Sequence, residues 1–112
     1  MGVFNLPSSL SLPKLTKVVE ATLALQVSGN VSAPLDTDAN RAYFTIYNPS
    51  MVDVYIDFST AANPTAPTAN SCSYILKSKS TYVSDFPYYT GKVVLACAAG
   101  TPSVIVRAFY ES

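Results

Sequence analysis

The side chains most often used in catalysis are largely missing from this sequence. It contains no His, the commonest general base and a member of most nucleophilic triads. The acids that could form a catalytic carboxylate pair, as in a glycosidase, are Glu20, Asp53, Asp57, Asp85 and Glu111. Several of them fall on the expected outer faces of strands, where solvated acids are common. We therefore expect a protein without catalytic residues, not an enzyme.

Two cysteines, Cys72 and Cys97, are the remaining candidates for metal or redox chemistry. Two thiolates alone do not complete a tetrahedral zinc site, and their spacing is not CxxC. Both lie in apolar stretches, so they could form a disulfide or remain as two buried thiols. Because nothing marks the chain for secretion, we favour thiols, and we expect no metal site and no cofactor.

The run from Asp36 to Asn40 resembles the opening of a calcium-binding EF-hand loop. Arg41 stands where that loop needs Gly, and Tyr47 stands where it needs a bidentate Glu. An Asx turn ahead of a strand is the simpler interpretation, because Asp and Asn side chains bond readily to the main chain two residues on.

Aromatic side chains indicate a different kind of site, a contact surface for another protein. Phe86, Tyr88 and Tyr89 fall in an expected turn, where rings are difficult to bury within the domain. Tyrosine offers a large contact area, a polar group and little side-chain entropy to lose. We select these three as partner-binding residues.

Three further tyrosines, Tyr43, Tyr47 and Tyr55, are expected on the side of adjacent strands opposite the core. They would form one aromatic patch. Either a partner protein or a second sheet of the same domain could cover that patch, and the second sheet is the simpler interpretation.

Residues 1 to 15 contain two prolines and an alternation of Ser and Leu, which indicate an extended N-terminal arm. Its apolar side chains need a surface to lie on. We select Leu6, Leu10 and Leu12 as partner-binding residues of this arm.

Alternating apolar and polar residues predict the strands that carry these side chains. Such alternation runs from Lys17 to Val27, with the odd-numbered residues from Val19 facing the core, then from Ala42 to Asn48 and from Val52 to Phe58. We expect the last two to pair as a hairpin. Loops are expected from Ser28 to Asn40 and from Ala61 to Asn70.

Later strand signals run from Cys72 to Lys77, Thr81 to Val83, Lys92 to Ala98 and Ser103 to Tyr110. The short link after Ala98 suits a second hairpin. No segment shows a helical period. The sequence therefore predicts an all-β fold, a small antiparallel β-sandwich or jelly-roll-like domain over residues 16–112 with the arm at residues 1–15.

The composition favours an assembly subunit. Only 12% of the 112 residues are charged, against about 25% in ordinary soluble domains. The formal net charge is zero, so we expect no nucleic-acid partner. No apolar run reaches the length of a membrane span, and the N-terminus lacks signal-peptide features. Small neutral subunits commonly self-associate around a symmetry axis, and we favour a trimer as the homo-oligomer.

Part of the chain resembles small bacteriophage virion proteins. The matching elements are Arg41-x-Tyr43-Phe44-x-Ile46-x-Asn48-Pro49-Ser50, Val54-Tyr55-Ile56-x-Phe58, Tyr89-x-Gly91-Lys92-Val93-Val94-x-Ala96, Val104-x-Val106 and Glu111. The chain departs from the pattern at Asn70-Ser71-Cys72, where such proteins often have a Pro-Gly-rich turn. Independently of the resemblance, we expect Arg41 to lock the hairpin base to a carboxylate such as Glu111.

The resemblance implies a small β-sandwich that decorates or cements a capsid, or that joins tail and fibre parts. The expected function is a virion structural protein, made in the host cytoplasm and placed on the capsid surface, that binds the major capsid protein or other virion proteins and stabilises the shell. The alternatives are a tail or fibre connector and a carbohydrate-binding or host-attachment module. In that module Tyr43, Tyr47, Tyr55 or Tyr88 would stack on sugars.

Overall fold

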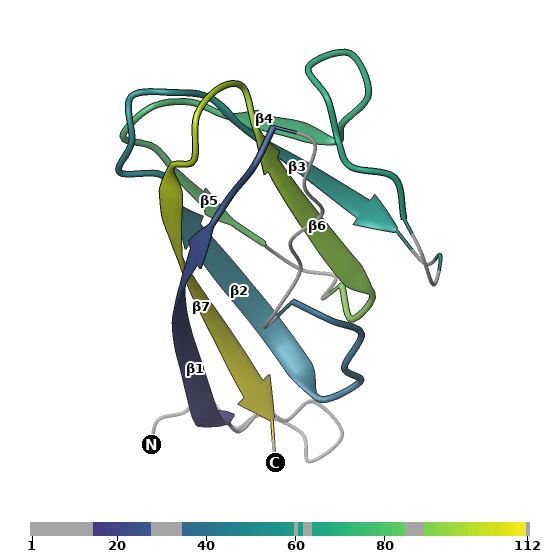
Figure 1. Cartoon of the computed structure of the whole chain (residues 1–112). Coiled ribbons are helices and arrows are strands. Elements are labelled where there is room, and N and C mark those ends of the chain that lie inside the picture. The colour runs from purple at the N-terminus through teal and green to yellow at the C-terminus, as the bar shows by residue number, and fades with distance from the viewer. Residues whose placement is uncertain (1–14, 28–34, 60, 62–63, 85–88, 112) are drawn as a thin grey trace, which may run out of the picture.

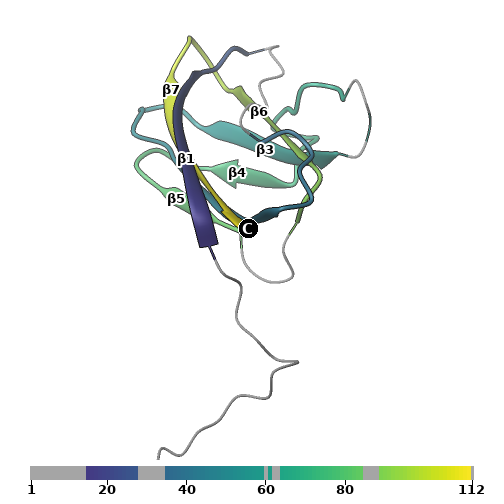
Figure 2. The same ribbon diagram turned by 90° about the horizontal axis from the view of Figure 1, so that it is seen from below.

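The computed structural model describes residues 15–27, 35–59, 61, 64–84 and 89–111. Within them the chain forms strands β1 (Leu15–Ala24), β2 (Arg41–Tyr47), β3 (Val54–Ser59), β4 (Tyr74–Leu76), β5 (Thr81–Val83), β6 (Lys92–Cys97) and β7 (Ser103–Glu111). The strands form two antiparallel sheets that pack on one another, as Figures 1 and 2 show from two directions. The predicted all-β sandwich is confirmed.

Sheet A has the strand order β1-β7-β2-β5, and sheet B has the order β4-β3-β6. The core lies between them and takes its buried apolar side chains from both sheets and from Leu25 and Leu35 in the flanking loops. Alternation produces this arrangement in β2 and β3, because Phe44, Ile46, Val54 and Ile56 are fully buried while their neighbours face outward.

The first strand ends earlier than the sequence pattern predicts. Val19, Ala21 and Leu23 are half-buried on the inner side of β1 and Leu25 is fully buried, as expected. Val27 was expected to continue this face, but it is 53% exposed. The cause is that β1 ends at Ala24.

The predicted hairpin between β2 and β3 is wrong, because the two strands belong to different sheets. Asn48, which is fully buried, holds the crossing between them. Its side-chain amide donates to the carbonyls of Val52 at 2.8 Å and of Leu76 and Lys77, both at 3.2 Å. Asn48 therefore ties the end of β2 to the end of β4 and turns the chain from one sheet to the other.

The predicted hairpin between the last two strands is also wrong, since β6 pairs with β3 while β7 lies between β1 and β2. Loop carbonyls occupy the other edge of β6. Val93 N donates to Leu35 O at 3.0 Å, and Cys97 N donates to Gln26 O at 3.2 Å. This cover explains why every residue from Val93 to Cys97 is buried although β6 is an edge strand.

Two of the expected loops are confirmed where the structure describes them. Asp38 Oδ1 accepts a hydrogen bond from Asn40 N at 2.9 Å, which is the Asx turn expected ahead of β2. The segment after β3 is irregular apart from a bridge between Thr68 and Ser71, although Pro67 within it is buried. The predicted N-terminal arm lies outside the described residues, except for Leu15, where β1 begins.

Candidate interaction surfaces

Arg41 is the most deeply buried charged residue among those described, with 1% of its surface exposed. Its Nη1 donates to the carbonyl of Asp36 and its Nη2 donates to the carbonyls of Tyr89 and Gly91. The expected ion pair with Glu111 is wrong. The guanidinium donates to main-chain carbonyls instead. Glu111 is linked to the residue before Arg41 by its main-chain N, which donates to Asn40 O at 2.8 Å.

The charge of Arg41 is stabilised without a direct carboxylate contact in the described chain. Burial lowers the pKa of the guanidinium from its ordinary value, and the nearby Tyr110 and Asp38 partly offset this effect. The guanidinium carbon also lies 5.3 Å from the centre of the Phe44 ring. Arg41 is thus a structural anchor that joins the start of β2 to the segments before β2 and β6, and it is not presented to a ligand.

Of the selected partner-binding residues, the structure describes only Tyr89; Leu6, Leu10, Leu12, Phe86 and Tyr88 lie outside the described residues. The Tyr89 ring packs 5.1 Å from that of Phe58. Its hydroxyl lies 3.1 Å from Ser59 O and 3.0 Å from Lys92 O, and donates its proton to one carbonyl at a time. A side chain at Gly91 would collide with this ring. Tyr89 is therefore held within the domain, and its contact with a partner stays a prediction.

The predicted single patch of three tyrosines is wrong. Tyr43 and Tyr47 lie on β2 in sheet A, whereas Tyr55 lies on β3 in sheet B. All three side chains point away from the core between the sheets. Tyr43 and Tyr47 therefore lie on one side of the sandwich and Tyr55 lies on the other. Within sheet A, Tyr43 stacks on Phe109 of β7, with ring centres 4.3 Å apart and planes 14° apart.

The outward-facing side chains of sheet A form a regular surface, which we call the outer face. Its members share the orientation opposite to the buried residues of their strands: Val18, Glu20 and Thr22 on β1, Tyr43, Thr45 and Tyr47 on β2, Val83 on β5, and Ile105, Arg107 and Phe109 on β7. Apolar and aromatic side chains lie on both sides of a central row of polar ones.

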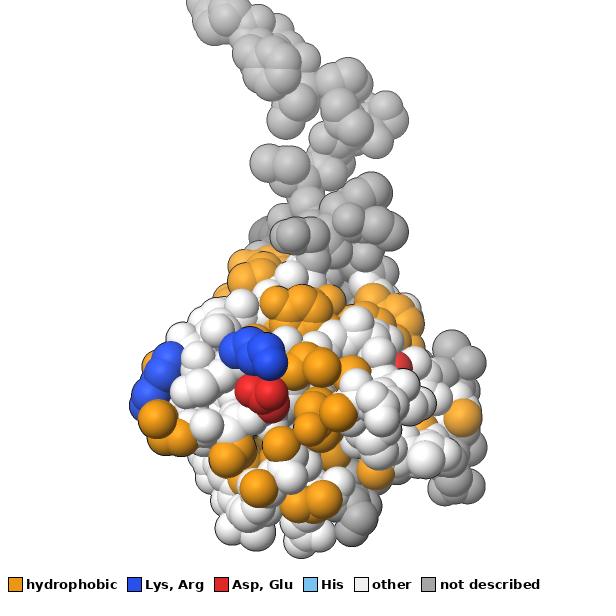
Figure 3. Space-filling view, turned by 90° about the horizontal axis from the view of Figure 1, so that it is seen from above, with side chains coloured by type: hydrophobic (Ala, Val, Ile, Leu, Met, Phe, Trp, Pro, Cys, Tyr) orange, Lys and Arg blue, Asp and Glu red, His pale blue; other side chains and the backbone are white. Residues whose placement is uncertain are grey.

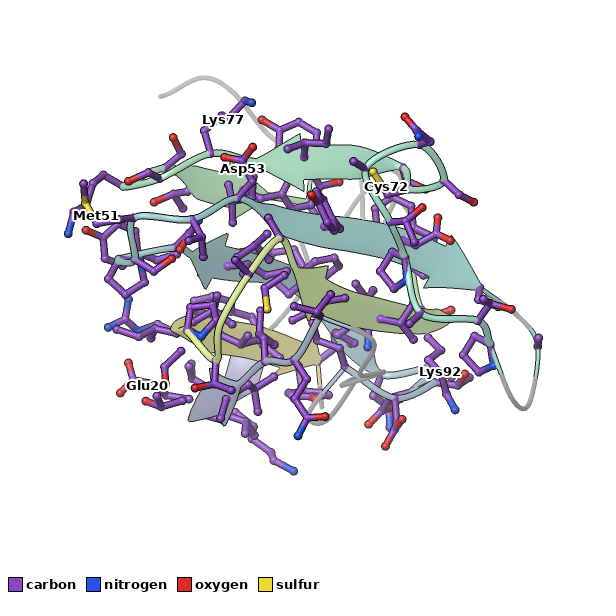
Figure 4. The ribbon with its side chains drawn as sticks, turned by 45° about the horizontal axis from the view of Figure 1, so that its top comes forward. Glu20, Met51, Asp53, Cys72, Lys77 and Lys92 are labelled. Atoms are coloured by element: carbon purple, nitrogen blue, oxygen red, sulfur yellow. The ribbon has the colours of Figure 1, made fainter. Side chains whose placement is uncertain are left out.

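Charge on the outer face is balanced internally. Glu20 and Arg107 are directly opposite each other on β1 and β7, and their side chains form an ion pair. A comparable pair joins Asp53, just before β3, to Lys77, just after β4, and the two lie side by side in Figure 4. Figure 3, which views the molecule from above the orientation of Figure 1, shows few charged side chains among neutral and hydrophobic ones at that end of the sandwich as well. Both ion pairs are partly exposed, so each contributes little to stability.

A row of aromatic side chains that the sequence pattern does not indicate lies where β4 and β5 approach each other. Tyr74 of β4 and Tyr82 of β5 meet across the two sheets at 4.9 Å, and Phe58 continues the row toward Tyr89. Tyr74 is 44% exposed. The sequence pattern does not predict this row, because β4 and β5 have only three residues each and show little alternation. The two strands also lie in different sheets, so their approach depends on the strand order of both sheets.

Both cysteines are free thiols, as favoured from the sequence, with Cys97 buried and Cys72 half-buried. Figure 4 shows Cys72 on the segment between β3 and β4. Burial raises the pKa of the Cys97 thiol. In the described part of the chain, no three His, Cys, Asp or Glu side chains cluster as a metal site would require. The same residues include no helix of the length and apolarity that crosses a bilayer.

Comparisons with known proteins do not assign this chain to a family. No protein-family model, curated protein or solved structure matches it.

Proposed function

We propose that this chain is a non-enzymatic structural protein of a bacteriophage particle, a decoration or cement protein that binds the major capsid protein and stabilises the shell. The observation that carries the proposal is the outer face of sheet A. Its half-exposed aromatic and apolar side chains surround one internally paired charge couple, Glu20 with Arg107.

Such a face suits permanent contact with another protein. The rings of Tyr43 and Phe109 are already stacked and lie on paired strands, so little side-chain freedom is lost on binding. Because Glu20 and Arg107 neutralise each other, a partner can cover them without leaving a charge unpaired. Aromatic residues enriched over charged ones are typical of the centre of protein interfaces.

The phage assignment comes from the sequence resemblance. Its elements fall on β2, β3, β6 and β7, and they include the two residues that organise the fold, Arg41 and Asn48. The resemblance therefore concerns structural positions and gives no contact residues. The choice of the capsid shell as partner is supported by the low charge and by the apolar residues selected in the arm.

The test mixes the purified chain with capsids that lack it and measures co-sedimentation and resistance of the capsids to heat. Wild type is expected to bind and to raise the temperature of capsid disruption. Tyr43→Lys, on the outer face, is expected to lose most of the binding. Tyr55→Lys is the matched control, because it places the same change on the outward side of sheet B. Equal binding by both variants would exclude the outer face.

A variant lacking residues 2–14 tests the arm separately. We expect it to keep its fold and lose attachment, and undiminished attachment would exclude a role for Leu6, Leu10 and Leu12. Thermal unfolding of each variant shows whether the fold is intact.

The exposed ring of Tyr74 beside Tyr82 supports a second candidate, a carbohydrate-binding or host-attachment module. A glycan array distinguishes the two functions. Specific glycan binding that is lost in Tyr74→Ala and kept in Tyr47→Ala would favour the module, whereas no binding to the array together with capsid binding would favour the decoration protein.

A further inference from the structure

The described strands leave four sheet edges, and three of them are protected against pairing with another chain. Strands β4 and β5 have three residues each, and very short edge strands offer few free hydrogen-bonding groups. The edge of β6 is occupied by the carbonyls of Gln26 and Leu35. Protection of this kind is how soluble β proteins avoid uncontrolled association.

The fourth edge, β1, lacks such protection. It is ten residues long and, within the described chain, pairs only with β7. Figure 1 shows β1 at the edge of sheet A, next to β7. It contains no proline, and its charged residues are Lys17 and Glu20. Main-chain groups on the side of β1 away from β7 therefore have no strand partner among the described residues.

The inner side of β1 is also incompletely covered. Val19, Ala21 and Leu23 face the core but are only half-buried. The inward residues of the neighbouring β7, such as Val104 and Val106, are fully buried. A strand added beside β1 would cover the exposed parts of these three side chains as well as pair the main chain.

We infer that β1 pairs with β1 of a second copy of this chain in antiparallel orientation across a two-fold axis. A two-fold pair is self-complementary, since the same strand supplies both halves of the ladder. The axis stands perpendicular to the sheet, so the inner faces of both copies lie on the same side. Val19, Ala21 and Leu23 of the two copies then form one continuous apolar seam.

Charge and side-chain size select the register. With Ala21 on the axis, Val19 lies opposite the partner subunit's Leu23, and Glu20 lies opposite the partner subunit's Thr22. Placing Glu20 on the axis sets two like charges against each other, which is unfavourable. Placing Val19 on the axis brings Lys17 against the partner subunit's Ala21 and interrupts the seam with a charge. The pairing therefore covers residues 18 to 24 of both copies.

This inference goes beyond attachment to a shell and holds whether or not the chain binds capsids. It also specifies a pair of copies in place of the trimer that composition favours. A dimer with two exposed outer faces on the same side would bind neighbouring capsid subunits together, each face strengthening the attachment of the other.

The first measurement is the mass of the purified wild-type chain by light scattering, with no capsid present. The expected mass is about twice 11.9 kDa. A monomer at every concentration tested, or a trimer, overturns the inference. Because no capsid is used, this result is independent of the outcome of the capsid-binding test.

The second measurement fixes the register with single cysteines introduced into a Cys72→Ser background, in which only the buried Cys97 remains. Ala21→Cys is expected to form a disulfide-linked dimer on mild oxidation, because the two Cα atoms at the axis lie about 5 Å apart. Thr22→Cys is the matched control. Its two copies are offset by two residues along the ladder, beyond the roughly 7 Å between Cα atoms that a disulfide spans.

Cross-linking of Ala21→Cys with none of Thr22→Cys supports the pairing. Equal cross-linking of both, or of neither while the wild type is dimeric, overturns it. Circular dichroism of each reduced variant shows that the fold is intact.

Discussion

The guanidinium of Arg41 donates a hydrogen bond to the main-chain carbonyl of Tyr89 at 2.9 Å, although 48 residues separate them in the sequence. Together with the bond to Asp36, it joins the first residue of β2 in sheet A to the segment that enters β6 in sheet B. This side chain adds to the main-chain hydrogen bond between the same segments, in which Asp38 N donates to Thr90 O at 2.9 Å.

Replacing Arg41 with Met is expected to lower the free energy of unfolding by about 3 kcal/mol, because three partly buried carbonyls lose their donor and each costs roughly 1 kcal/mol, the lower end of the range for buried groups. Loss of the buried charge offsets part of that cost. Urea denaturation measures the change. Arg107→Met is the control, since its exposed ion pair with Glu20 is worth less than about 1 kcal/mol. Equal losses in the two variants would contradict the anchoring role.

Asn48→Asp tests the crossing from β2 to β3. The substitution keeps the shape but replaces a donor with a buried charge that faces three carbonyls. We expect a loss of about 3–5 kcal/mol at neutral pH, the usual cost of an uncompensated buried charge. Asn70→Asp, at an exposed loop position, should change stability little. A small effect at residue 48 would show that the amide does not hold the corner.

Ile56→Ala tests the packing of the core. Ile56 is fully buried between the sheets, so its truncation is expected to cost about 2–5 kcal/mol. The matched control is Ile75→Ala on the neighbouring β4, where the side chain faces outward and is half-buried. Chemical denaturation of both variants gives the comparison, and a cost below about 1 kcal/mol at Ile56 would mean that the register of β3 is wrong.

Thiol reactivity should separate the two cysteines. Cys97 is fully buried, and burial raises the pKa of its thiol, so little thiolate forms. We expect a thiol reagent at pH 8 to modify Cys72 in the native protein and to modify Cys97 only after denaturant is added. Peptide mass spectrometry identifies the modified residue. Rapid modification of Cys97 in the folded chain would contradict its position in the core.

Alkaline pH should destabilise the fold. Burial raises the pKa of Cys97 and of Tyr110 above their ordinary values of 9.0 and 10.0. The folded chain therefore holds these protons at pH values where the unfolded chain has released them, and the free energy of unfolding falls as pH rises above about 9. Denaturation from pH 7 to 11 measures the decline. Cys97→Ala should remove the part that begins near pH 9, and an unchanged profile in that variant would assign the decline to other groups.

The strands could be predicted from the sequence because alternation depends only on which residues face the core. Phe44, Ile46, Val54 and Ile56 are buried as the pattern indicated. The pairing of the strands could not be predicted in the same way. A short link suits a hairpin and also suits a crossing between two sheets, and the deciding interactions of Asn48 come from residues 28 and 29 positions away.

The candidate surfaces were predictable only in part, for the same reason. The outward orientation of Tyr43 and Tyr47 follows from alternation, but whether Tyr55 joins them depends on the sheet to which β3 belongs. A charged residue at the start of a strand suggests a carboxylate partner. The three carbonyls that Arg41 meets instead leave no trace in residue types, since every residue has a main-chain carbonyl.

The pairing of β1 with β7 sets Leu15 opposite Glu111, and the C-terminal end lies beside the start of β1 in Figure 2. Sheet A therefore cannot be completed during synthesis until β7 has left the ribosome, because β7 lies between β1 and β2. Until then β1 and β2 have no strand between them. The whole chain between β1 and β7 must be brought together before the pairing of β7 with β1 and β2 can form. Folding of this domain should consequently be slow for its size.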